Sequence, residues 1–132
     1  MKRKVYTGKR TFLRYNEKQV LAYLNEEIVE NFVPEDAEDG TEPVTGYAYT
    51  GPEEDGGTLL DTDGTDRDSL INAVIRTQYS QSEEDAIKTH QLLLLQNPEH
   101  EKRAEYQSEW AQFLVERENA INMVDNWIYS GV

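Results

Sequence analysis

The feature that most constrains this chain is an apolar stripe in its last third, downstream of Pro98. The stripe recurs at steps of three, four and seven residues, and its members are Trp110, Phe113, Leu114, Ala120, Ile121, Val124 and Ile128. This spacing places side chains on one face of an α-helix. A helix over 98–128 would be about 45 Å long, against about 25 Å for the helix expected just before it. About half of the stripe therefore needs a further partner: an earlier helix, a sheet or a second copy of the chain.

Two shorter helices are predicted upstream of this stripe, each opened by a capping box. Thr65 with Asp68 predicts the first start, and Ser80 with Glu83 predicts the second. The apolar residues expected on these two helices are Leu70, Ile71, Val74 and Ile75, followed by Ala86, Ile87, Leu93 and Leu94. Asn97-Pro98 closes the second helix and starts the last one, because proline is tolerated at the first helical position. So short a connection makes the last two helices antiparallel neighbours.

The first half of the chain is predicted to be rich in β-strands. Apolar and polar residues alternate over 5–15 around a turn at 7–9, which indicates a strand or a hairpin. Residues 17–33 leave two interpretations open. Apolar residues four apart favour a helix that ends at Pro34, whereas evenly spaced turn triplets favour a β-meander with strands over 11–15, 19–24 and 28–33. We favour the meander.

A second β element is expected after an acidic loop over 34–43. Residues 44–50 alternate as a strand does, and 51–57 have the composition of a turn. Residues 58–61 can return as the partner strand. This pattern predicts a β-hairpin.

Charge is segregated along the 132 residues, which carry 26 acidic and 13 basic side chains and a net charge of −13. Residues 1–18 contain seven Lys or Arg and one Glu, whereas residues 26–68 contain fifteen acids and one Arg. The acidic balance opposes binding to duplex nucleic acid, which needs a positive face. The two charged segments could instead neutralise each other within the fold.

Together these patterns predict a single α+β domain. A small antiparallel N-terminal sheet and a β-hairpin over 1–61 are followed by a C-terminal three-helix unit over 62–132, with a long last helix. The chain has no cysteine, which excludes disulfides and thiolate chemistry. Residues 92–95 form the longest run of large aliphatic side chains, far short of the about 20 residues of a membrane span. No secretory signal is recognised at the N-terminus, and a cytoplasmic location is expected.

No motif indicates catalysis, a cofactor or a metal ion, so a non-enzymatic protein without a cofactor is expected. The motifs G-x-S-x-G, Walker A and G-x-G-x-x-G do not occur. The acidic run 61–68 departs from the EF-hand pattern, because Asp66 stands where glycine is needed and Asn72 where Glu is needed. A turn with a helix cap is the preferred interpretation. His90 and His100 could approach each other between the last two helices, but a zinc site would need two more ligands.

Several motifs follow one another within residues 44–115. Their order is Tyr47-Ala48-Tyr49-Thr50-Gly51, Asp55-Gly56-Gly57-Thr58, Leu70-Ile71 and Arg76-Thr77-Gln78-Tyr79-Ser80. The order resembles small uncharacterised prophage-encoded proteins of gut anaerobic bacteria, which often lie among virion or tail genes. The resemblance implies a phage virion or tail-associated structural role and brings no catalytic residues. The last motif is also explained as a corner between two helices, with Ser80 as cap, Tyr79 at the joint and Arg76 at a favourable helix end.

The function expected from the sequence is a protein–protein interaction or assembly module. It would act through the long helix, on a protein partner or on a second copy of the chain. Aromatic side chains anchor interfaces as well as cores. The expected interaction residues are Tyr106, Trp110, Phe113, Leu114, Ile121, Val124 and Trp127.

Two alternatives concern nucleic acids. The acidic surface could mimic DNA phosphates and inhibit a DNA-binding protein. The basic, aromatic N-terminus could stack on single-stranded nucleic acid, or it could be an edge strand that its charge protects from aggregation.

Overall fold

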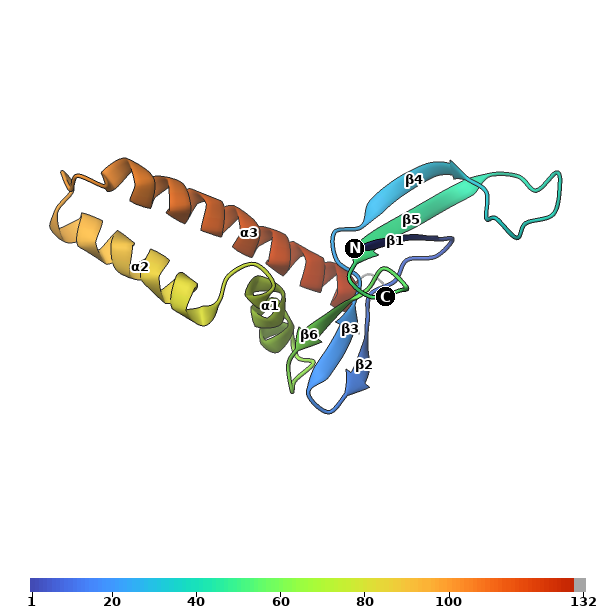
Figure 1. Cartoon of the computed structure of the whole chain (residues 1–132), viewed down its shortest axis with the longest axis horizontal. Helices are drawn as coiled ribbons and strands as arrows, with labels where there is room; N and C mark the ends of the chain where they lie inside the picture. The colour runs from blue at the N-terminus through green and yellow to red at the C-terminus, as the bar shows by residue number, and fades with distance from the viewer. Residues whose placement is uncertain (130–132) are drawn as a thin grey trace. The chain divides into compact units, whose positions relative to one another are not determined.

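The computed structural model describes residues 1–129 of the chain, which divides into two compact units, Met1–Asp63 and Gly64–Val132 (Figure 1). Over the described residues, the first unit contains six strands and the second contains three helices. The α+β class with strands first is therefore confirmed. The division between the units falls two residues beyond the predicted change from strands to helices at 61.

The strands are β1 (Lys2–Tyr6), β2 (Phe12–Asn16), β3 (Gln19–Ala22), β4 (Glu27–Phe32), β5 (Val44–Gly51) and β6 (Thr58–Asp61). They form two antiparallel three-stranded sheets, in the orders β1-β5-β4 and β2-β3-β6. The strand interpretation of residues 17–33 is confirmed, and the helix alternative is wrong. Asn25 has a φ of 53°, a left-handed conformation that would interrupt a right-handed helix and that asparagine tolerates.

Two strand pairings differ from the prediction. β6 does not form a hairpin with β5 but pairs with β3, whereas β5 lies between β1 and β4. A strand has two hydrogen-bonding edges, and both edges of β5 are occupied. The intervening turn closes on itself, because Gly56 N donates to Glu53 O at 3.0 Å with Gly56 at a φ of 83°. β4 likewise leaves the predicted meander and joins β5 in the other sheet.

Three tyrosines join the two sheets inside the first unit. Tyr6 and Tyr49 come from β1 and β5 of one sheet, and Tyr23 directly follows β3 of the other. The three ring pairs have centroid distances of 6.3, 6.2 and 5.5 Å, and Tyr23 and Tyr49 are 2% and 1% exposed. The Arg10 guanidinium lies 4.0 Å from the centre of the Tyr6 ring, within cation–π distance. We call Tyr6, Tyr23 and Tyr49 the tyrosine cluster.

Every hydroxyl of the tyrosine cluster has an acceptor. Tyr23 donates to Asp55 Oδ2 at 2.6 Å, Tyr49 donates to Glu26 Oε1 at 2.7 Å, and Tyr6 donates to the carbonyl oxygen of Asp55 at 2.5 Å. The hydrogen bond from Tyr23 lowers the pKa of Asp55, although burial opposes this effect. Burial in turn raises the pKa of all three tyrosines. The cluster is thus a hydrogen-bonded part of the core.

The basic N-terminal segment forms a strand and ion pairs within the first unit. β1 is an edge strand of its sheet, as the alternative interpretation of this segment expects. The cations of this segment pair with acidic residues from the middle of the chain: Arg3 pairs with Glu27 at 3.4 Å, and Lys9 pairs with Glu26 at 3.8 Å. Such exposed ion pairs are each worth at most about 1 kcal/mol. The residues between β4 and β5 contain no helix or strand, as predicted for the acidic loop 34–43.

The helices of the second unit are α1 (Arg67–Arg76), α2 (Gln81–Gln96) and α3 (Arg103–Tyr129). α1 and α2 both pack on α3 (Figure 1). The hydrogen bonds Arg67–Asp125, Gln78–Glu116 and Gln91–Tyr106 show that both run antiparallel to it. The 27 residues of α3 span about 40 Å, and the 10 and 16 residues of α1 and α2 together span nearly as much. α1 is therefore the further partner that the long stripe needs.

The ends of the helices confirm one capping box and correct another start. Ser80 and Glu83 form the capping box predicted for α2. Asp66, rather than Thr65, caps α1, because its carboxylate accepts from Ser69 N at 3.2 Å and from Ser69 Oγ at 2.7 Å. The acidic run 61–68 therefore supplies a helix cap.

The last helix also starts later than predicted. α3 begins at Arg103 rather than at Pro98. Turn hydrogen bonds hold the connection between α2 and α3, from His100 N to Asn97 O and from Arg103 N to His100 O. This extra connection shortens α3 at its N-terminal end.

Replacing Tyr23 by Phe removes the hydroxyl that binds Asp55 and keeps the ring. We expect the free energy of unfolding to fall by about 1–2 kcal/mol, because a hydrogen bond to a charged group is lost. Urea denaturation followed by circular dichroism measures this change. Tyr15→Phe is the matched control, since Tyr15 is 58% exposed and should change stability by less than about 0.5 kcal/mol. Equal losses in the two variants would contradict the role of the tyrosine cluster.

Candidate protein-interaction surface of the helical unit

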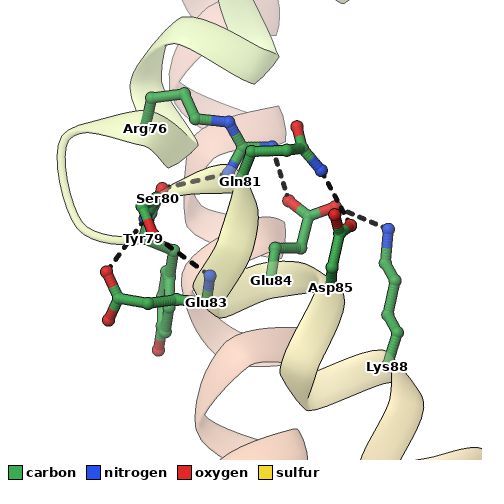
Figure 2. Close-up of polar contacts among 8 residues, drawn as sticks. All are labelled: Arg76, Tyr79, Ser80, Gln81, Glu83, Glu84, Asp85 and Lys88. Carbon is green, nitrogen blue, oxygen red and sulfur yellow. Dashed lines mark hydrogen bonds and ion pairs between the residues drawn. The ribbon is translucent and has the colours of Figure 1, made fainter.

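A polar corner between α1 and α2 sets the direction of α2. Ser80 Oγ accepts from Glu83 N at 3.0 Å, and Ser80 N donates to Glu83 Oε1 at 3.1 Å (Figure 2). Next to Ser80, the side-chain amide of Gln81 donates to Asp85 Oδ1 at 2.9 Å. The two bonds between Ser80 and Glu83 satisfy backbone N–H groups that the first turn of a helix leaves unpaired. The corner therefore starts α2 at a defined residue.

Glu84 is the one buried charged side chain of residues 1–129, at 7% exposure. Its Oε1 accepts from Arg76 Nη2 at 2.7 Å, and its Oε2 accepts from Lys88 Nζ at 2.5 Å (Figure 2). Burial raises the pKa of Glu84, but the hydrogen bonds from Lys88 and Arg76 outweigh it, so the pKa lies below its ordinary value. Arg76 also donates to the carbonyl oxygen of Tyr79 at 3.0 Å. The charged carboxylate thus ties the end of α1 to the start of α2.

Tyr79, at the joint of the corner, reaches α3. Its ring stands edge-on to Phe113, with centroids 5.3 Å apart and an interplanar angle of 85°. Trp110 stacks on the same Phe113 at 5.9 Å. Burial raises the pKa of the Tyr79 hydroxyl. The corner motif recognised in the sequence therefore anchors both short helices on the long one.

The seven predicted interaction residues do not share one surface. Phe113 and Val124 are 2% and 0% exposed, so they belong to the core rather than to a free face. Leu114 is 43% exposed. The other four are half-buried, and they are Tyr106, Trp110, Ile121 and Trp127. The chain itself covers most of the stripe, which removes the argument that half of it needs an external partner.

At the far end of the α2–α3 hairpin, two histidines flank Tyr106. The His90 ring stacks on the Tyr106 ring at 4.0 Å and 8°, and the His100 ring lies 5.3 Å from it. His90 Nδ1 also pairs with Glu109. Both histidines therefore lie against the same tyrosine ring. Within residues 1–129, no three His, Asp or Glu side chains are placed to hold a metal ion.

Unlike most of the stripe of α3, three leucines near the end of α2 are exposed. Leu92, Leu93 and Leu95 are 61%, 40% and 79% exposed, and we call them the leucine cluster. The sequence contains no acidic residue between Asp85 and Glu99, although acidic side chains are frequent elsewhere. Large apolar side chains with few charges are typical of the centre of a protein interface.

Leu92 and Leu95 are not among the residues predicted from the sequence to form a surface, and Leu93 is expected on the apolar side of its helix. A signal for them was present, because four leucines follow one another. Successive residues of an α-helix turn by about 100°, so four neighbours cannot all face α3. Leu94 is half-buried, and the other three are left on the outside.

No helix among residues 1–129 combines the length and the apolar character that crossing a membrane requires.

Comparison with known proteins does not assign the chain to a family. No protein-family model, no curated protein and no solved structure matches it.

Glu84→Gln tests the corner. We expect the free energy of unfolding near neutral pH to fall by about 1–3 kcal/mol, because Arg76 loses a charged acceptor in a part-buried site. Since the pKa of Glu84 is lowered by folding, its contribution is present above the unfolded pKa and is lost as the pH falls through the folded pKa. The variant should therefore lose stability less steeply on acidification than the unaltered protein.

Denaturation in urea at several pH values between neutral and acid measures both effects. Glu118→Gln is the control, because Glu118 is exposed on α3 and loses the same charge. An acid dependence that is the same in Glu84→Gln and in the unaltered protein would contradict the role of this carboxylate.

Proposed function

We propose that this protein is a non-enzymatic interaction or assembly module, and that it buries the leucine cluster against a protein partner. The observation that carries the proposal is the exposure of Leu92, Leu93 and Leu95 in a part of α2 that has no acidic side chain. Large exposed apolar patches on a protein are features of protein–protein interaction sites.

The α2–α3 hairpin presents these leucines on a well-held helix. The capping box and Glu84 hold the start of α2, and the pair of His90 and Glu109 holds its later turns against α3. A partner therefore binds a helix that is already formed, which lowers the entropy cost of association. An apolar groove that accepts a helix face is the partner surface that this arrangement suits.

The proposed surface lies on α2 rather than on the stripe of α3, because α1 and α2 cover that stripe. Leu114 and Val115 of α3 are also exposed, at 43% and 54%. The proposal includes a role in a phage virion or tail. Its support is the resemblance of the motifs between residues 44 and 115 to small prophage-encoded proteins that often lie among virion or tail genes.

Site-specific crosslinking tests the proposal. A photoreactive phenylalanine analogue at position 95, in cells that express the chain naturally, should give one defined adduct with a protein partner. The substitution Leu92→Ser in the same chain should reduce the adduct strongly, because an apolar contact beside the probe is lost. Both positions are exposed, so the fold should change in stability by less than about 0.5 kcal/mol.

The matched control carries the probe at Leu13, which is 47% exposed on β2. The same adducts from positions 13 and 95, or none from position 95, would overturn the proposal. If the adduct joins two copies of this chain, sedimentation velocity should show dimers that dissociate on dilution. A strict monomer at high concentration would then contradict self-association.

A second candidate function is an acidic mimic of DNA that inhibits a DNA-binding protein. Its support is the acidic loop, where five exposed carboxylates form no ion pair within residues 1–129; they belong to Glu35, Asp36, Glu38, Asp39 and Glu42. Binding of a basic DNA-binding protein should then weaken steeply as salt rises. Replacing all five by Gln or Asn should abolish that binding, and salt-insensitive binding would contradict this candidate.

A further inference from the structure

α2 and α3 run side by side as a hairpin (Figure 1), and the spacing of residues along each helix shows which side chains share a face. On α2, Lys88, Leu92 and Leu95 stand at steps of four and three residues. A stripe on α3 follows steps of seven, four, three and four residues, and its members are Arg103, Trp110, Leu114, Arg117 and Ile121. Such steps bring side chains to one side of a helix.

These two stripes lie on the same side of the hairpin. Lys88, Arg117 and Ile121 line one common hollow. His90 lies two positions after Lys88 and therefore points to the opposite side of α2. The pair of His90 with Glu109 places this acid on the opposite side of α3. We call the side that carries the two stripes the cationic face.

The cationic face exposes apolar side chains from both helices. Leu92, Leu95 and Leu114 are exposed, and Trp110 is half-buried. The leucines of α2 therefore continue onto the edge of the α3 stripe that the chain leaves uncovered. From Arg103 to Leu114 this edge is about 16 Å long, which corresponds to about three helical turns.

Charge separates the two faces of the hairpin. α2 and α3 contain three Lys or Arg, and all three belong to the cationic face. They are Lys88, Arg103 and Arg117. On the opposite side of α3, acids stand at steps of four and seven residues. They are Glu105, Glu109 and Glu116. The hairpin therefore keeps its cations beside the exposed apolar side chains.

The acids of the two helices that border the cationic face gather at the end nearest the corner. They are the buried Glu84 and the exposed Asp85 and Glu118. At the other end, Arg103 pairs with Glu99 of the connection at 3.0 Å. Such an exposed pair contributes little stability, so Arg103 can bind a carboxylate of a partner instead. Along α3, the apolar residues of the face thus have Arg103 before them and Arg117 after them.

We propose that the protein partner covers the cationic face with an acidic amphipathic helix of about three turns. Its apolar side packs on the exposed leucines of both helices and on Trp110, and its flanking carboxylates meet Arg103 and Arg117. A helix laid along a two-helix hairpin buries its apolar side against both helices at once. This inference rests on the proposed function and specifies the chemistry of the partner.

A second copy of this chain suits the face less well. A symmetric contact between two copies places the same surface patch on both sides of the interface. The cationic face would then oppose its own cations, and like charges across an interface disfavour association. An acidic helix supplies the opposite charge.

Site-specific crosslinking from both helices tests this partner. In cells that express the chain naturally, a photoreactive phenylalanine analogue at position 95 or at position 114 should give an adduct with the same segment of one protein. Mass spectrometry of the crosslinked peptides should show apolar residues at steps of three and four in that segment, with Asp or Glu beside them. The matched control carries the probe at Val115, which is exposed but lies about 100° around α3 from Leu114, and it should give no adduct.

A charge reversal tests the role of the cations. Arg103→Glu, with the probe at position 95, should lower the yield of the adduct about tenfold, because a carboxylate of the partner would face a like charge. Lys102→Glu is the matched control and should keep the yield. Lys102 is exposed, directly precedes α3 and stands seven positions before Glu109 of the opposite face. Circular dichroism checks that both variants keep their helices.

The outcomes separate this inference from the proposed function. No adduct from position 95 would overturn both. An adduct from position 95 but not from position 114, equal adducts from positions 114 and 115, or an adduct with a second copy of this chain would overturn the acidic helix alone. A crosslinked segment without the amphipathic pattern, or equal yields in Arg103→Glu and Lys102→Glu, would do the same.

Discussion

The helical unit depends on how one long helix hides its apolar stripe. α3 has 27 residues, and neither of the other two helices within residues 1–129 matches its length. α1 and α2 solve this together, since they lie one after the other along α3 and run antiparallel to it. Three contacts stabilise the corner between α1 and α2: the capping box, the ion pair of Glu84 with Arg76, and the contact of Tyr79 with Phe113. Burial of Phe113, Ala120 and Val124 follows from that arrangement.

The distribution of charge distinguishes one part of the surface of the helical unit from the rest. Its acids outnumber its bases two to one, and the buried Glu84 uses two of the few cations. The acid-free stretch of α2 ends in the exposed leucines, which lie outside the buried core. We propose these leucines, rather than the buried residues of the α3 stripe, as the surface that a protein partner covers.

Residue patterns predicted much of the fold. The period of apolar residues placed the three helices, and turn triplets placed the strands of residues 17–33, because both signals are local. Strand partners were harder to predict. Several strands could pair with β5, and local sequence does not distinguish among them. β1 and β4 occupy the two edges of β5, and β6 pairs with β3. The tyrosine cluster was also missed, since Tyr6, Tyr23 and Tyr49 lie far apart in sequence and meet only when the two sheets pack.

The sequence by itself determined the α+β class, the Ser80 cap and the amphipathic character of the last helix, because each depends on residues within a few positions of one another. Only the tertiary structure decided which apolar side chains are left outside. Phe113 and Val124 became core because α1 supplied the missing partner, whereas Leu92 and Leu95 stayed exposed because a helix turns about 100° per residue. Periodicity states that a face is apolar, but the elements that pack on that face decide whether it is available.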